Sequence, residues 1–73
     1  LPKGSDVASA DGHKVGDLDE VELDGDANVE AIVVRAGFLF HHDLRLPAAE
    51  ISEFDDKKVR LKVTKDAAEA HRA

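Results

Sequence analysis

The chain has 73 residues, carries a formal net charge of −6 at pH 7 and contains no Cys, Met, Trp or Tyr. This length allows one domain with one small core, so a deep substrate pocket inside it is not expected. The missing cysteines exclude disulfides, thiolate metal sites and a thiol nucleophile, and they are consistent with a cytoplasmic protein. The acidic charge argues against a nucleic-acid binder. No apolar run reaches the ~20 residues of a transmembrane helix, so we expect no membrane association.

The first third of the sequence predicts two strands joined by a tight turn. Turn residues recur about every 8–12 residues, which favours short strands over helices. We expect a brief strand over residues 6–9, a turn at 10–13 that contains Asp11-Gly12, and a second strand over 14–23. Gly16 inside the second strand predicts a bulge or a close backbone approach. The apolar phase also shifts along this strand, which again predicts a bulge.

The middle of the chain predicts a central strand followed by a polar turn. Residues 29–36 contain apolar side chains on both faces, as expected for a central strand or for one whose outer face is covered. Short strand pieces at 38–40 and 44–46 flank the sequence His41-His42-Asp43. Pro47 has no N–H to donate, so it should end this part of the sheet.

The last third predicts one more strand and a short helix. Apolar and polar residues alternate strictly over residues 59–64, which is typical of a half-buried strand. Thr64 is a residue type that commonly caps helices. We expect it to begin a helix over residues 65–71 that has little apolar surface to bury.

These elements, in this order and spacing, resemble the PRC-barrel, a small β-barrel named after the photosynthetic reaction centre H subunit. The segments that carry the resemblance are Gly4-Ser5-Asp6-Val7, Asp11-Gly12-His13-Lys14-Val15-Gly16, Val29-Glu30-Ala31-Ile32-Val33-Val34, Gly37-Phe38-Leu39, Leu44-Arg45-Leu46-Pro47 and Val59-Arg60-Leu61. The resemblance implies an all-β fold, a small barrel of about six short antiparallel strands, to which the predicted C-terminal helix is added.

The resemblance also implies a domain organisation and a type of function. We expect a single domain over residues 1–73, with its core at 4–64 and a helical tail at 65–73, and the missing Met predicts that the chain was cut from a longer protein. PRC-barrel proteins usually dock onto another macromolecule without catalysis. They include the reaction-centre H subunit, the C-terminal end of a ribosome-maturation factor and many stand-alone stress-associated or uncharacterised bacterial and archaeal proteins. Several stand-alone members look like homodimers. The family has no universal site residues, so none is carried over.

Charge is unevenly distributed along the chain. Residues 17–30 contain seven acidic residues and no basic one, whereas residues 57–65 contain five basic residues and no acidic one. One interpretation is two solvated strand faces that attract each other across the barrel. The other is a dipolar surface that steers self-association or a charged partner. The sequence leaves open whether the two segments pair within one chain or between chains.

His41 and Asp43 are the candidates for a metal site, because alternate residues of a strand share one face. The chain has four histidines in all, and zinc takes about three or four ligands, so the main alternative is an exposed polar turn. A metal ion bound between two chains would be an exception to this alternative, because each chain would then provide part of the ligands. Residues 24–28 imitate the start of a calcium loop, but Val29 stands where that loop needs Gly and Arg35 where it needs Glu. We therefore expect no cofactor.

The aromatic turn is the candidate partner-binding surface. In an extended segment Phe38 and Phe40 point to one side and Leu39 to the other, so one of these sides can face solvent. Ile32 and Val34 on the preceding strand would extend such an apolar patch and anchor a partner. The alternative is that the small core takes up all of these side chains.

We therefore expect a non-enzymatic binding module that forms a homodimer and docks onto an unidentified protein partner, in a stress-related setting. Paired acids on an exposed strand provide no burial to separate two pKa values, which argues against catalysis. The alternative is a ribosome- or RNA-associated factor, by analogy with the ribosome-maturation protein, although the net charge disfavours nucleic acid as a partner. A metal-binding protein that uses His41 and Asp43 is the second alternative.

Overall fold

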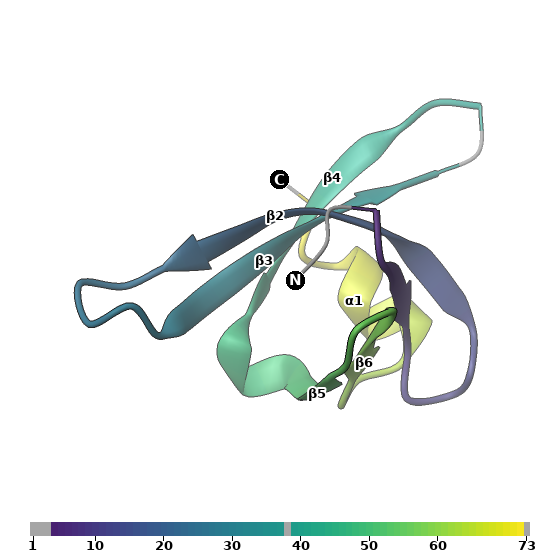
Figure 1. Ribbon diagram of the computed structural model, residues 1–73. Coiled ribbons are helices and arrows are strands. Elements are labelled where there is room, and N and C mark those ends of the chain that lie inside the picture. Colours follow the sequence, from purple (N-terminus) through teal and green to yellow (C-terminus); the bar gives the residue numbers. More distant parts are fainter. Residues whose placement is uncertain (1–3, 38, 73) are drawn as a thin grey trace.

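The computed structural model describes residues 4–37 and 39–72 and places six strands of this part of the chain in one sheet (Figure 1). The elements, in chain order, are β1 (Asp6–Ala8), β2 (Lys14–Leu23), β3 (Val29–Ala36), β4 (His42–Pro47), the 3₁₀ turn η1 (Ala48–Glu50), β5 (Ile51–Phe54), β6 (Lys58–Leu61) and α1 (Lys65–Glu69). The predicted all-β fold with a short C-terminal helix is confirmed. No helix in these two ranges is long and apolar enough to span a membrane.

The strands follow the order β4-β3-β2-β1-β6-β5, and the sheet curls without closing. The pairs β1–β2, β2–β3, β3–β4 and β5–β6 are antiparallel, but β1 and β6 run parallel. The predicted small β fold of about six strands is confirmed, with one pair, β1–β6, that departs from the predicted antiparallel arrangement. The reason is topological, because no tight turn joins β1 to β6 and so none imposes opposite strand directions on them.

The region around β4 and β5 also differs from the prediction. Residues 39–40 form a bend rather than a strand piece, and β4 begins at His42 and ends at Pro47, where the ladder was predicted to end. The strand β5 was not predicted, and α1 ends at Glu69 rather than at residue 71. The strands over residues 14–23 and 29–36 are confirmed at both ends.

The core lies on the inner face of the curled sheet. Figure 1 shows α1 and the β5–β6 hairpin on the same side of the β2–β3–β4 part, and α1 packs against β2 and β4. The core is formed by aliphatic side chains from every strand and by one small residue of the helix: Val7, Val15, Leu18, Ile32, Val34, Ala36, Leu44, Leu46, Ile51, Val59, Leu61 and Ala68. The helix contributes only Ala68, so it adds little apolar burial.

Gly16 explains how β2 and β3 approach each other. A Cβ at this position would collide with the backbone oxygen of Arg35, so the close approach predicted for Gly16 is confirmed. The predicted bulge is present as well, because Leu18 faces Val34 while Glu20 faces Val33, which leaves one extra residue in β2. After the bulge Val21 packs against the core again, whereas Leu23 at the end of the strand stays exposed.

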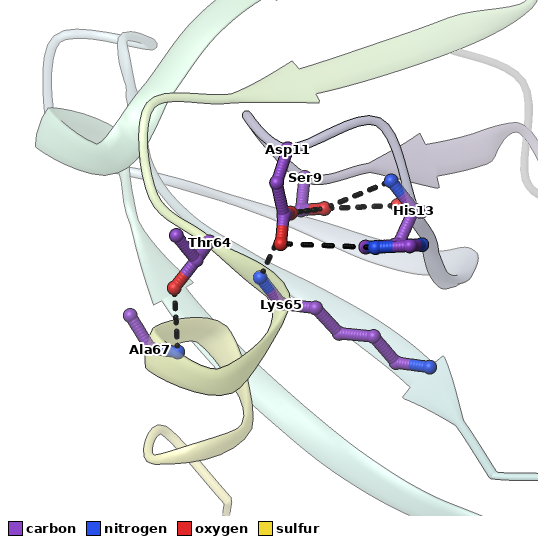
Figure 2. Close-up of polar contacts among 6 residues, drawn as sticks. All are labelled: Ser9, Asp11, His13, Thr64, Lys65 and Ala67. Atoms are coloured by element: carbon purple, nitrogen blue, oxygen red, sulfur yellow. Dashed lines mark hydrogen bonds and ion pairs between the residues drawn. The ribbon is translucent and has the colours of Figure 1, made fainter.

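Polar contacts fix the helix to the rest of the chain. Thr64 Oγ1 accepts a hydrogen bond from the amide of Ala67 at 3.2 Å, which confirms the predicted N-cap. Asp11 Oδ1 accepts from the Ser9 hydroxyl and, at 3.2 Å, from the Lys65 amide, so the first hairpin turn is tied to the helix start (Figure 2). At the other end, the amide of Arg45 donates to the carbonyl of His71 at 3.0 Å.

Candidate interaction surface

The connection between β3 and β4 exposes two large apolar side chains. Leu39 is 77% exposed and Phe40 is 86% exposed, and we call this pair the apolar tip. Gly37 has a φ of +98°, and a Cβ there would collide with the backbone oxygen of Phe40, so only glycine fits this turn. Phe38, which was predicted to share this surface, lies outside the described residues.

Ile32 and Val34 lie away from this surface. Both are fully buried, and they pair across the strands with Leu46 and Leu44 in the core. They point inward because β3 is an interior strand whose inner face carries the core. The prediction that they extend an exposed apolar patch is therefore wrong, and the candidate surface reduces to the hairpin tip.

A hollow of about 410 Å³ lies where β3 runs into its connection to β4. Gly37 and His41, which flank the apolar tip, line it together with residues of β2, β3 and α1. Its titratable side chains are Lys14, Asp17, Arg35, His41, Lys65 and Glu69. We call this feature the hollow, and it places charged groups directly beside exposed apolar ones.

The two carboxylates of the hollow are already paired. Asp17 Oδ1 lies 3.1 Å from Lys14 Nζ, which also lies 3.2 Å from Asp6 Oδ1, and hydrogen bonds to Asp17 and then Asp6 raise the pKa of Lys14. Glu69 Oε2 lies 2.9 Å from His42 Nε2. Among the described residues that line the hollow, no carboxylate is therefore unpaired.

The two remaining cations of the hollow are free to bind an anion. Among the described residues, neither the Arg35 nor the Lys65 side chain has an ion-pair partner within 4.0 Å. Asp43 stands directly across the strands from Arg35 without reaching it. Figure 2 shows the Lys65 side chain extending away from Asp11. The hollow therefore combines two unpaired cations with the neighbouring apolar tip.

The β2–β3 hairpin has the opposite character. Leu23 at the end of β2 is 56% exposed, and Asp24 and Asp26 in the adjoining turn are exposed as well; we call these three residues the acidic tip. Asp24 Oδ1 accepts hydrogen bonds from the amides of Asp26 at 2.8 Å and Asn28 at 3.0 Å, which orders the turn. The Asp26 carboxylate has no hydrogen bond or ion pair among the described residues.

The candidate metal ligands His41 and Asp43 line the same hollow. His41 lies just before β4, and with Asp43, Asp19, Arg35 and His42 it lines a second hollow of about 350 Å³. His42 is engaged by Glu69, and His71 Nε2 lies 2.7 Å from Glu50 Oε2. Within residues 4–37 and 39–72, no three His, Cys, Asp or Glu side chains are grouped as metal ligands.

The acidic and basic segments form ion pairs with other parts of the chain. Glu22 Oε1 accepts from Arg45 at 2.8 Å, and Asp17 pairs with Lys14. In the basic segment, Arg60 Nε lies 4.0 Å from Glu53. These three contacts do not connect residues 17–30 to residues 57–65, so the idea that the two segments attract each other across the sheet gains no support from them.

The comparison with protein families covers nearly the whole chain, since the PRC-barrel domain matches residues 1–68. The chain belongs to the PRC-barrel family. A search of curated proteins finds no match to this PRC-barrel domain. The resemblance that the short motifs indicated is thereby confirmed.

Sequence reasoning missed part of the surface of this PRC-barrel domain. It identified Phe40, and it included Lys65 only as a member of the basic segment 57–65, but it did not identify Leu23 or Arg35. Leu23 directly precedes an Asp-Gly turn, and an apolar residue at a hairpin end is a signal that could have been used. Arg35 and Lys65 are 30 residues apart in sequence, and only the docking of α1 against β2 and β4 brings both to one hollow.

Proposed function

We propose that this PRC-barrel domain is a non-enzymatic protein-binding module that self-associates and docks onto another protein through its apolar tip. The observation that carries the proposal is the exposure of Leu39 and Phe40 on a turn fixed by Gly37. Exposed apolar side chains grouped at one place are typical of interaction sites, and aromatic anchors often dominate the binding energy.

The family resemblance supports the setting of this function. Stand-alone PRC-barrel proteins are stress-associated in several cases, and we place this domain in a stress-related role in the cytoplasm on that basis. The partner is another protein rather than nucleic acid, because the domain carries a net charge of −6.

Self-association is tested by sedimentation equilibrium of the wild type up to millimolar concentration, with and without a chelator. Phe40→Ser should shift the chain to monomer, because Phe40 is the most exposed large apolar side chain in residues 4–37 and 39–72. Phe54→Ser is the matched control, since Phe54 is partly exposed on β5 and away from the apolar tip.

The outcomes separate the alternatives. A wild type that stays monomeric at every concentration would contradict self-association. Association that survives Phe40→Ser would place the contact elsewhere on the surface. Dissociation by the chelator would instead favour a metal shared through His41 and Asp43.

A further inference from the structure

The two hairpin tips are chemically complementary. The acidic tip presents Leu23 beside the carboxylates of Asp24 and Asp26, whereas the apolar tip stands beside the unpaired cations of the hollow. The molecule measures 35 × 22 × 22 Å, and Figure 1 shows the β2–β3 and β3–β4 hairpins projecting away from each other. A single chain therefore cannot bring its own two tips together.

We propose that the acidic tip of one copy docks into the hollow and against the apolar tip of a second copy, which gives a head-to-tail contact. This inference rests on the proposed function, because it uses the apolar tip as a self-association surface. Leu23 would contact Phe40 and Leu39, and the free carboxylate of Asp26 would pair with Arg35 and Lys65. Charge complementarity is the argument for a second copy as the occupant.

The same charges disfavour a twofold contact between two apolar tips. Such a dimer would place the hollow of one copy near the hollow of the other, and each hollow contains the unpaired cations Arg35 and Lys65. Like charges brought together across an interface weaken it. In the head-to-tail contact the two cations meet the free carboxylate of Asp26 instead.

A head-to-tail contact has a consequence for assembly. It joins two different surfaces, so each added copy leaves one acidic tip and one hollow open, and growth continues unless a ring closes. One hairpin tip is a small contact compared with a stable protein–protein interface, so the association should be weak. We expect dissociation constants of about 10–1000 μM, in the range of weak, concentration-dependent association.

Two variants separate the two surfaces. Leu23→Ser with Asp26→Lys disables the acidic tip and keeps Asp24, whose carboxylate orders the turn. Arg35→Glu with Lys65→Glu disables the hollow. Asp56→Lys makes the same charge change as the first variant, and Lys57→Glu with Lys62→Glu makes the same charge change as the second. These matched controls lie at exposed positions outside both surfaces.

Sedimentation of each variant alone, and of an equimolar mixture of the two disabled variants, tests the proposal. Each disabled variant alone should associate at least tenfold more weakly than the wild type, while the controls keep wild-type association. The mixture should form a complex of two chains and nothing larger, because only one intact contact is available. The circular dichroism of each variant checks that it is folded.

Two results would overturn the head-to-tail contact. If the variant with the disabled acidic tip associates like the wild type while Phe40→Ser does not, the apolar tip still mediates self-association but in a different arrangement. In that case the proposed function stands and this inference falls. If the mixture stays monomeric although the wild type associates, the two tips do not bind each other.

Discussion

The β2–β3–β4 part of the sheet and the β5–β6–α1 part are stabilised in different ways. The first consists of strands of 10, 8 and 6 residues, and its inner face contributes Leu18, Ile32, Val34, Leu44 and Leu46 to the core. The second consists of two strands of 4 residues and a helix of 5. The long strands are stabilised by the apolar side chains that alternate along them, whereas the short elements depend on hydrogen bonds in their turns and caps.

In the β5–β6–α1 part, particular side chains order the turns and cap the helix. Asp55 Oδ1 accepts hydrogen bonds from the amides of Lys57 at 2.9 Å and Lys58 at 2.8 Å, which orders the β5–β6 turn. Thr64 caps the helix, and Glu69 and Glu50 bind His42 and His71. Regions with little apolar burial open at lower free energy than the core, so the C-terminal part should exchange its amide protons first.

The largest effect is expected from Ile32→Ala in the first part. Ile32 is fully buried between β2 and β4, and the substitution leaves a cavity beside Leu46. The free energy of unfolding should fall by about 2–5 kcal/mol. Chemical denaturation measures this value, and Ala68→Gly in the helix serves as the comparison because far less apolar volume is removed. An equal loss at both positions would contradict the contrast between the two parts.

Gly16→Ala tests the close approach of β2 and β3. The added methyl group would collide with the backbone oxygen of Arg35, which cannot move as a side-chain end can. We expect a loss of about 1–3 kcal/mol in the free energy of unfolding. The control is Gly25→Ala, because a Cβ there meets no atom within 4 Å, and this variant should unfold at wild-type denaturant concentration or slightly above.

A smaller effect, with a distinct pH dependence, is expected from Asp55→Ala in the second part. Hydrogen bonds from the amides of Lys57 and Lys58 lower the pKa of Asp55 below its ordinary value of 3.8. A lowered pKa in the folded state means that this carboxylate stabilises the fold above that ordinary value and loses its effect as the pH falls through the lower, folded value. The stability difference between wild type and Asp55→Ala should therefore be constant near neutral pH and shrink in acid.

Asp55→Asn separates the charge of this residue from its geometry. An amide oxygen can still accept the two backbone hydrogen bonds, but it does not titrate. This variant should keep most of the stability that Asp55→Ala loses, with no change across the acidic range. Thermal unfolding at several pH values provides the comparison, and a stability difference that grows as the pH falls would refute the assignment.

The same contrast explains which features could be predicted from the sequence. The strands over residues 14–23 and 29–36, the close approach at Gly16 and the cap at Thr64 follow from local patterns, and all are present. The strand β5 has only Ile51 buried, so no alternation marked it. The parallel pairing of β1 with β6 and the lining of the hollow both depend on segments that are far apart in sequence, so no local pattern predicts them. The exposure of Phe40 could be proposed from the sequence because it depends only on the local turn.

The smallest effect, and a gain, is expected from Ala27→Gly at the acidic tip. Ala27 has a φ of +64°, and among the described residues it is the only non-glycine residue with a positive φ. The left-handed conformation costs an L-residue about 1–2 kcal/mol, and glycine regains most of this against its own entropy loss of about 0.5–1 kcal/mol. A net gain of about 0.5 kcal/mol should appear as a higher denaturation midpoint.

Because the substitution leaves Leu23 and Asp26 in place, head-to-tail association should persist in this variant. A stabilised hairpin that no longer associates would show that the strain at Ala27 shapes the acidic tip for binding.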